Sequence, residues 1–453
     1  MKASIRSFLF FLCLISTANF TRAQELPRLS PDTVLMHSAP LVTLDEALAI
    51  ALRQNYSLRI AERDLEIAEN NVTIGNAGFL PSLQASGNYN YSNQDTRIEF
   101  ASPEADNIDR SGAVSESYGG ALTLNYTIFG GGRFYIYDRL IAQSDIARLQ
   151  ESQAMQQTIL DVSTQYLDMA GQYRSVQINE QAIAISAERY LRVKGRYEFG
   201  GVSKLELLNA EVDLRNDSIT WKQSILAFKQ QQNDFNVLLG VPVDTTYRID
   251  TAFSYTRNLE LQTILSEADQ RNPSLRLAKL DRQVNELRVK ETNAGFWPIL
   301  DLSGGYQYNR TENEAGFVAL QRTKGWNTAL NLTFVIYDGD NRNRLVQNAE
   351  VNLASSDIRL EQARATLQAD IRNAWVAYTT NVDLLESSLD NLEVARLQYT
   401  RSQEAFATGE INGLDLRDAQ LNLIRARKNV SDQQIAVRQA EISLYYHAGL
   451  LVE

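Results

Sequence analysis

Two periodicities alternate along this chain, and the alternation occurs twice. Residues 55–92 begin with a helical pattern of apolar positions and change, at Pro81, to strict alternation of apolar and polar side chains. Residues 272–309 repeat this pattern 217 positions later without a gap, and the change falls at Pro298. A period that shifts from 3.6 to 2 predicts a helix that passes into a strand. The chain is therefore an internal duplication, which has to be recognised before domains are counted.

Four stretches carry the alternating pattern, at about 82–92, 118–129, 299–309 and 326–337. Segments of about 10 residues with one apolar and one polar face are typical of outer-membrane barrel strands. A soluble hairpin would explain any one of them, but four matched strands on a chain with a secretory signal favour the membrane. Unpaired sheet edges cannot face hydrocarbon, and four strands are too few to close a barrel. Several copies of the chain must then share one barrel.

Each pair of strands is followed by a very long helical hairpin, at 132–240 and at 340–449. A helix of this length extends for roughly 100 Å at 1.5 Å per residue, so the sequence predicts a rod. Each hairpin reverses at a glycine turn, with one tip near 199–203 and the other near 407–413. Apolar positions spaced alternately three and four apart predict a coiled-coil seam. The seam contains Ile159, Val162, Tyr166, Met169, Tyr173 and Val176 and, 209 positions later, Ile371, Trp375, Tyr378, Val382 and Leu385.

The duplication also sets the expected domain boundaries. A secretory signal with a basic start, a short apolar core and a small-residue cleavage site is expected at the N-terminus. An extended, proline-bearing N-terminal lead follows it. The expected segments are the signal at 1–23, the lead at 24–42, the first structural repeat at 43–240, a crossover at 241–258 and the second repeat at 259–453.

Composition narrows the range of functions. The only cysteine, Cys13, lies within the signal, which excludes thiol catalysis and thiolate metal sites in the exported chain. Removing the signal takes away three basic residues, so 41 basic residues stand against 55 acidic ones and the net charge is −14. That charge argues against nucleic acid as a partner, because phosphate binding needs clustered positive charge. Outside the signal, no apolar run reaches the ~20 residues that a transmembrane helix needs.

The sequence does not indicate an enzyme, a cofactor or a metal site. His37 and His447 are the two histidines, and no motif surrounds either of them. Gly130-Gly131-Gly132 follows a strand and precedes a helix, but it lacks the spacings of phosphate-binding glycine loops. We interpret the glycines as a linker into the helix.

The plan resembles the TolC-like outer-membrane efflux proteins over nearly all of residues 43–450. The most specific shared features are two junctions and two tip turns, and each pair is duplicated. They are Ala77-Gly78-Phe79-Leu80-Pro81, Ala294-Gly295-Phe296-Trp297-Pro298, the turn from Gly200 to Ala210 and the turn from Gly409 to Ala419.

The resemblance implies a fold that is mainly α with membrane β: four strands per protomer in a shared twelve-stranded trimeric barrel, above a periplasmic tunnel of long helices. It also implies a location in the cell outer membrane, in contact with lipid, with most of the chain in the periplasm. The implied function is that of a passive exit duct. The implied partners are two further copies of the chain, a periplasmic adaptor protein and an inner-membrane transporter.

Gate residues are implied by the same resemblance. A pair of aspartates past the second tip lines the constriction in this family, and the matching positions are Asp415 and Asp418. Six carboxylates around a narrow pore would attract cations and could be bridged by divalent ions. Glu206 keeps an acid at the family's latch position, but the latch partners are replaced by Ile411 and Phe406. The sequence leaves open whether Arg417 substitutes for the missing cation.

The tips are the expected adaptor contacts, although glycine at a helical turn has a sufficient structural reason in positive φ. The candidate contact residues are Gly200, Gly201, Val202, Leu205, Gly409, Glu410, Ile411 and Leu414.

Two alternatives stay open at this point. A periplasmic coiled-coil adaptor or scaffold without a pore would explain the long hairpins but not the four matched strands. Within the duct interpretation, efflux of small molecules and type I secretion share one exit architecture, and the sequence does not choose between them. The loops at 93–116 and 310–324 carry no assigned role.

Overall fold

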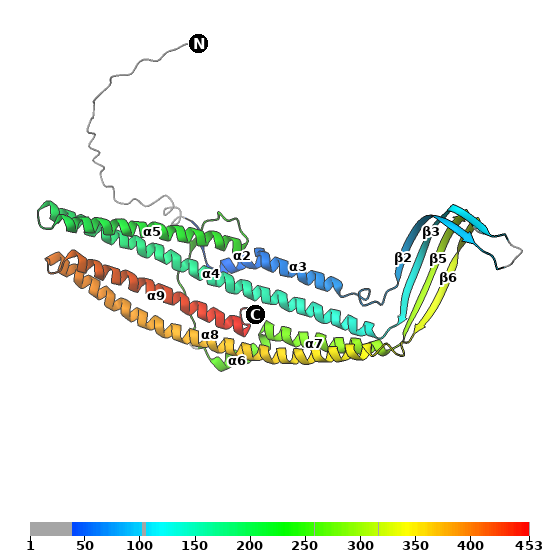
Figure 1. Ribbon diagram of the computed structural model, residues 1–453. Helices are drawn as coiled ribbons and strands as arrows, with labels where there is room; N and C mark the ends of the chain where they lie inside the picture. The colour runs from blue at the N-terminus through cyan, green and yellow to red at the C-terminus, as the bar shows by residue number, and fades with distance from the viewer. Residues whose placement is uncertain (1–38, 102–105, 258, 316, 453) are drawn as a thin grey trace, which may run out of the picture.

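The protomer is a long rod with a sheet at one end and two helical tips at the other (Figure 1). The computed structural model describes residues 39–101, 106–257, 259–315 and 317–452. The expected signal and nearly all of the expected lead lie outside these residues. The internal duplication predicted from the sequence is confirmed, because the two halves contain the same elements in the same order.

The helices form two matching sets. The first set comprises α2 (Leu44–Gln54), α3 (Tyr56–Asn71), α4 (Gly132–Glu198) and α5 (Lys204–Leu239). The second comprises α6 (Leu261–Arg271), α7 (Pro273–Asn293), α8 (Asn341–Thr408) and α9 (Gly413–Ala448), with a 3₁₀ turn (Ala294–Phe296) after α7. The return helices α5 and α9 are both 36 residues long and begin 209 positions apart.

The sheet at the far end contains four antiparallel strands in the order β2-β3-β5-β6. These strands are β2 (Ser82–Ile98), β3 (Ile108–Phe129), β5 (Ile299–Asn313) and β6 (Leu320–Thr333). The two predicted hairpins therefore exist and pair with each other through β3 and β5. Within the protomer, β2 and β6 each have one edge that pairs with no described strand.

The strands extend further than the alternating pattern indicated. Much of the regions 93–116 and 310–324, expected as loops, is strand. The pattern missed this because these parts are held by polar pairs; the Ser115 hydroxyl, for example, donates to Asn313 Oδ1 at 2.5 Å. The last strand, in contrast, ends at Thr333 and not at 337. Residues 334–337 continue the alternating sequence, but they pair with no residue of β5.

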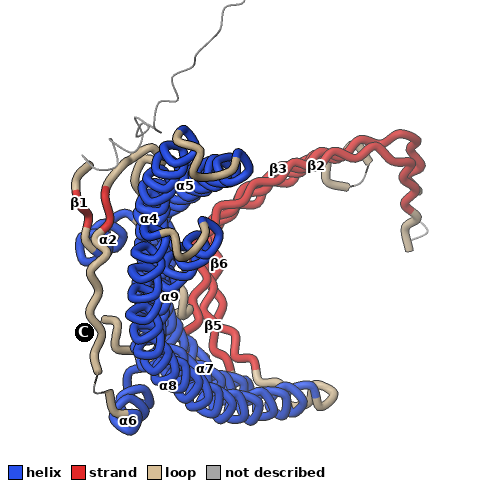
Figure 2. Tube along the Cα trace, turned by 90° about the vertical axis from the view of Figure 1, so that its left-hand side faces the viewer, coloured by secondary structure: helices blue, strands red, loops and turns tan. Residues whose placement is uncertain are grey.

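The centre of the rod is α4, which contacts α3 and α7 toward the sheet and α5 and α9 toward the tips. Its predicted seam is buried: Val162, Tyr166 and Met169 have no exposed surface. Tyr166 also fastens the crossover to the N-terminal segment, because its hydroxyl donates to Val42 O at 2.8 Å and accepts from Asp250 N at 3.1 Å. There β1 (Leu41–Val42) pairs in parallel with β4 (Arg248–Ile249) on one side of the rod (Figure 2).

A duplicated asparagine joins each return helix to the helix beyond it. Asn55 Oδ1 accepts from Leu58 N and caps α3, while its Nδ2 donates to Leu238 O near the end of α5 at 2.7 Å. Asn272 makes the same two bonds at the junction of α9 and α7, with His447 O at 2.9 Å. In each repeat the return helix and the helix beyond it are thereby joined end to end into one column.

A duplicated arginine connects the sheet to the helices. Arg133 donates to the backbone oxygens of Gly78 and Thr127 and lies over the ring of Phe79. Arg342 does the same at Gly295 and Phe296 in the second repeat. The three glycines do act as a linker, since α4 begins at the last of them.

Candidate functional site

The two tips are built from the same turn. Gly200 and Gly409 follow α4 and α8 with φ of 76° and 84°, a left-handed conformation that glycine adopts without steric cost. Ser203 caps α5 by accepting from Glu206 N at 3.2 Å. Asn412 caps α9 and accepts from Asp415 N at 3.1 Å. The turn therefore gives hydrogen-bond partners to backbone groups at both helix ends, since Gly201 N and Glu410 N also donate to carbonyls at the ends of α4 and α8.

The predicted gate acids lie on the tip surface of the protomer. Asp415 is exposed and completes the capping box, because Asn412 N donates to its carboxylate at 3.4 Å. Asp418 is exposed and lies one turn further along α9. Glu206 is half-buried and lines a cavity of about 290 Å³ between the two hairpins, together with Gly413. Asp415 thus has a structural role at the start of α9.

The positions of the missing latch are occupied by an apolar cluster. Phe406 is fully buried against Tyr190, Val193 and Leu207. Ile411 packs against the same cluster. The cluster brings α4, α5 and α8 together at the tip through hydrophobic contact, so the replacement residues contribute apolar packing there.

Arg417, whose direction the sequence left open, points into the first hairpin. Its guanidinium donates to both oxygens of Asp217 at 2.7 and 2.8 Å and lies 3.8 Å from Asp213 Oδ1. It also donates to the Ser186 hydroxyl at 3.3 Å. Burial alone would lower the pKa of Arg417, but the hydrogen bonds and the charge of Asp217 raise it above its ordinary value. Arg417 is therefore a buried cation paired with two aspartates of the other hairpin.

A second buried arginine extends this group of charges. Arg189 of α4 forms a salt bridge with Asp213 and donates to Gly413 O at 3.2 Å. Gln420 of α9 adds a bond from its amide to the Ser186 hydroxyl at 3.1 Å. Of this group, the sequence singles out only Arg417. The other residues lie outside any motif, and only the approach of three helices brings them together.

The candidate adaptor contacts form the exposed end of the rod. Leu205 and Leu414 are exposed one turn after each tip, and Val202 and Ile411 are partly covered. Phe199, which the sequence did not single out as a contact, has 93% of its surface exposed. Exposed apolar side chains at a rod end are typical of a surface that another protein covers.

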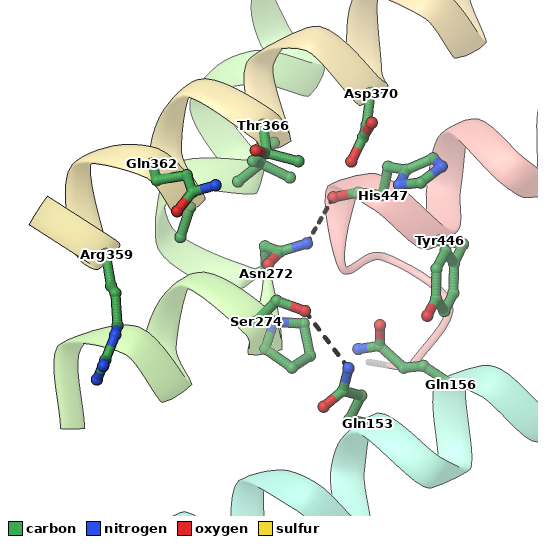
Figure 3. Close-up of a pocket in the computed structure, with 13 residues that line it drawn as sticks. Gln153, Gln156, Asn272, Ser274, Arg359, Gln362, Thr366, Asp370, Tyr446 and His447 are labelled. Carbon is green, nitrogen blue, oxygen red and sulfur yellow. Dashed lines mark hydrogen bonds between the residues drawn. The ribbon is translucent and has the colours of Figure 1, made fainter. Parts of the chain in front are cut away.

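A larger cavity, of about 410 Å³, lies far from the tips, at the junction of α9 and α7 (Figure 3). It is lined mainly by polar side chains, among them Gln153, Gln156, Thr366 and Asp370. None of the predicted site residues lines it. In the described ranges, no cluster of three or more His, Cys, Asp or Glu side chains is arranged to hold a metal ion. No described helix is long and apolar enough to cross a membrane.

Comparison with known proteins identifies what this architecture is similar to. The family model described as "Outer membrane efflux protein" matches residues 47–241 and 264–450, which are the two repeats. The outer membrane protein TolC of Vibrio cholerae serotype O1 is 22% identical over 392 residues, covering 84% of this chain and 85% of that protein. The cation efflux system protein CusC of Escherichia coli K12 is 22% identical over 415 residues, covering 88% and 84%.

Solved structures show the same fold. The CmeC outer membrane channel of Campylobacter jejuni superposes with a TM-score of 0.73 at 17% identity, covering 90% of this chain and 87% of that chain. A crystal structure of CusC gives a TM-score of 0.71 at 17% identity, covering 90% and 92%.

Proposed function

The chain belongs to the outer membrane efflux protein family, and from this premise we propose that three copies form a passive exit duct through the outer membrane. Its strands contribute to one shared barrel, and its helices continue the duct through the periplasm to a closed tip. A periplasmic adaptor binds the tips, and an inner-membrane transporter loads the duct. Cargo passes through without chemical change.

The observation that carries this proposal is the pair of open sheet edges. In lipid, each free N–H or C=O group along the edges of β2 and β6 would cost about several kcal/mol if it stayed unpaired. Pairing β6 of one protomer with β2 of the next removes both edges. Three protomers with four strands each then give twelve strands, a number within the range of known membrane barrels.

The helical edges support the same assembly. Within the protomer, Leu167 of α4 shares an apolar cluster with Ile435 of α9. Their repeat counterparts, Val376 of α8 and Leu226 of α5, are both exposed. They lie on opposite edges of the protomer, so a neighbouring chain can bring its Leu226 onto Val376.

The same relation holds nearer the sheet. Ala142 of α4 packs against Val284 of α7. The counterparts, Val351 of α8 and Ile67 of α3, are again exposed on opposite edges. The contacts between the two repeats of one protomer thus predict the contacts between neighbouring protomers. The proposed trimer then has three interfaces within protomers and three similar interfaces between them.

The gate follows from the positions of the exposed acids. With three copies around the axis, Asp415 and Asp418 contribute six carboxylates to the narrow end of the tunnel. Such a ring favours cations and binds divalent ions that block the pore. Glu206 contributes a further acid from the other hairpin of each protomer.

Single-channel recording on detergent-extracted protein tests the duct and the gate together. Wild-type trimers are expected to give small cation-selective steps that divalent ions block. Asp415→Asn with Asp418→Asn should weaken both the selectivity and the block. Asparagine is preferred to alanine because it keeps an acceptor for the capping box at 415. Asp390→Ala with Glu393→Ala removes the same charge from the exposed surface of α8 and serves as the control.

Three outcomes would contradict parts of the proposal. Protein that is extracted without detergent as a monomer argues for a scaffold without a pore. Trimers whose selectivity is unchanged by the asparagine variants argue against the acid ring. An equal effect of the control pair would mean that overall charge, and not the tip, sets the selectivity.

A further inference from the structure

The apolar face of the sheet ends in a group of cations. β5 and β6 pair in constant register, so the residues with even numbers on both strands share one face. Most of that face is apolar, and it is the face that the proposed barrel turns toward lipid. An aromatic pair, Tyr306 and Trp326, marks the end of the apolar part. Beyond this pair the same face carries Arg310, Arg322 and Lys324, which we call the rim cations.

The position of the rim cations along the strand matches the border of a bilayer. Lys324 and Leu332 are eight positions apart on β6, which is about 27 Å at ~3.4 Å per residue. With the tilt of about 40° that membrane barrels have, this is about 21 Å of height, against an apolar band of about 25 Å. Aromatic residues line both borders of such a band, and Trp326 has 84% of its surface exposed. The rim cations therefore lie at the level of lipid head groups, at the end of the sheet that is far from the helices (Figure 1).

The two arginines lie in an unfavourable arrangement unless an anion joins them. Arg322 is directly opposite Arg310 in the ladder. Like charges at such positions destabilise a sheet, because their Cβ atoms are only about 5 Å apart. Arg310 is partly balanced, since it pairs with Glu312 and its Cζ lies 5.7 Å from the ring centre of Tyr118. Its Nε, however, is buried and has no hydrogen-bond partner among the described residues.

The charge on β6 has no counter-charge within the protomer. Arg322 and Lys324 are both exposed, and in the described part of the chain neither of them has an acidic partner. Two acids share their face of the sheet. Glu312 is paired with Arg310, and Glu116 lies on β3, which is separated from β6 by β5. The edge of the sheet at β6 is therefore positively charged.

The equivalent positions of the first hairpin carry no cation. Its aromatic pair, Tyr89 with Tyr118, corresponds to the pair of the second hairpin. At the positions of the rim cations it has an amide, an apolar side chain and an acid, namely Asn93, Val114 and Glu116. The rim cations therefore distinguish the second hairpin, and they occur once in each protomer.

We propose that the rim cations bind the phosphate groups of an anionic lipid in the outer leaflet of the membrane. This proposal rests on the proposed barrel and adds a lipid site to its outer surface. Guanidinium groups bind phosphate oxygens through paired hydrogen bonds, and an ammonium group adds a point charge. A phosphate between Arg310 and Arg322 removes their repulsion, and Lys324 contributes from the same face. The acyl chains of the lipid then lie along the apolar residues beyond Trp326, which a free phosphate ion would leave uncovered.

Native mass spectrometry of delipidated, detergent-extracted protein counts the lipid that binds to each chain. The probes are bisphosphorylated lipid A, zwitterionic phosphatidylcholine and inorganic phosphate. Arg322→Gln with Lys324→Gln removes the two unbalanced charges and keeps polar side chains. Arg276→Gln with Arg288→Gln removes the same charge from exposed positions of α7 and is the matched control.

The expected result is one lipid A for each wild-type chain. The double variant at 322 and 324 should bind lipid A at least about tenfold more weakly, and the control should stay within about twofold of the wild type. Phosphatidylcholine should bind more weakly than lipid A and equally to all three proteins. Inorganic phosphate should not displace lipid A, because it lacks the acyl chains.

Four outcomes would overturn the lipid site. These are equal binding of lipid A and phosphatidylcholine, an equal loss in the control, and complete displacement of lipid A by inorganic phosphate, which would indicate a site for the free ion. The fourth is a variant at 322 and 324 that loses the trimer but binds as much lipid A per chain, because the cations then pair with acids of a neighbouring chain.

The count per chain also separates this proposal from that of the duct. Trimers that conduct but bind no lipid A would remove the lipid site and keep the duct. Protein that binds lipid A at the rim cations but forms neither a trimer nor a channel would contradict the duct and keep the lipid site.

Discussion

The helices α4 and α8 are two copies of one long element that occupy different places in the protomer. They contain 67 and 68 residues and carry the same apolar seam. In α4, 22 residues are buried, whereas in α8 only 8 are. α4 has neighbours on both sides, while α8 lies at an edge of the protomer (Figure 2).

Equivalent positions show that the difference lies in the surroundings and not in the residue type. Leu167 of α4 has 0% of its surface exposed, and its counterpart Val376 has 61%. Two further pairs behave in the same way: Ala142 with Val351, and Leu149 with Ile358. An apolar residue that is buried in one copy and exposed in the other marks a surface that the isolated protomer leaves uncovered. The comparison teaches that α8 is a surface helix of the single chain, and that the proposed trimer would make it a core helix.

The sharpest test of this comparison introduces a charge at equivalent positions. Leu167→Asp buries an unpaired carboxylate and should destabilise the protomer by more than about 4 kcal/mol, which prevents folding. Val376→Asp should leave the protomer folded and abolish the trimer. Circular dichroism reports the helix content, and native mass measurement in detergent reports the oligomer. Trimers that persist with Val376→Asp would show that this face of α8 is not an interface.

A second test compares the aromatic residues of the two seams. Tyr166→Ala removes a fully buried ring and two backbone hydrogen bonds and should cost about 3–5 kcal/mol. Trp375→Ala, at the equivalent position, removes a partly buried ring and should cost less. Urea unfolding of detergent-solubilised protein measures both. Tyr166→Phe separates the hydroxyl from the ring and should cost about 1–3 kcal/mol; equal losses for the two alanine variants would contradict the central position of α4.

A third test uses the two helix-end glycines. Gly240 and Gly449 both have positive φ, and an added Cβ would lie 2.3 Å from Gln54 O and 2.8 Å from Arg271 O. Each alanine variant should cost about 1–3 kcal/mol, with the larger cost at Gly240. Gly195→Ala is the control, because a Cβ there meets nothing within 4 Å and helix propensity predicts a small gain. A larger cost at Gly449, measured by urea unfolding, would contradict the tighter packing of the first junction.

The smallest expected effect concerns pH. Burial lowers the pKa of His447 below its ordinary value of 6.5, and Asp370 opposes the shift. As the pH falls below about 6.5, His447 is therefore protonated more fully in the unfolded chain than in the folded chain. The free energy of unfolding decreases over this range. His447→Leu installs the residue of the equivalent position, Leu238, and should flatten this dependence between pH 7.5 and 5. An unchanged pH profile of urea unfolding would show that His447 does not contribute to it.

Much of the fold could be predicted from the sequence because it depends on local pattern and on repetition. The change of period at Pro81 and Pro298 located both strand regions, and the seam through Val162 and Tyr166 located the long helices. Strand ends were less predictable. Beyond the stretches that alternate between apolar and polar residues, side chains such as those of Ser115 and Asn313 are held by polar pairs between strands. These pairs leave no periodic signal in the sequence.

The candidate site divides in the same way. The tip glycines follow from a duplicated local motif, whereas Asp415 and Asp418 were predicted from the family resemblance. Asn412 with Asp415 three positions later has the spacing of a capping box. Arg189, Asp213 and Asp217 have no such signal, because their partners lie on other helices and are far away in the chain. Their pairing exists only where α4, α5 and α9 approach each other.

The sequence by itself determined the duplication, the order of elements and the length of the rod, and it supplied the prediction that more than one copy shares the membrane barrel. These follow from periodicity and from the chemistry of unpaired backbone groups. The tertiary structure alone decided which copy of the long helix is enclosed and that Arg417 of the second hairpin pairs with Asp213 and Asp217 of the first. The physical reason is that burial and ion pairing depend on neighbours, and two nearly equivalent helices acquire different neighbours only when the chain folds.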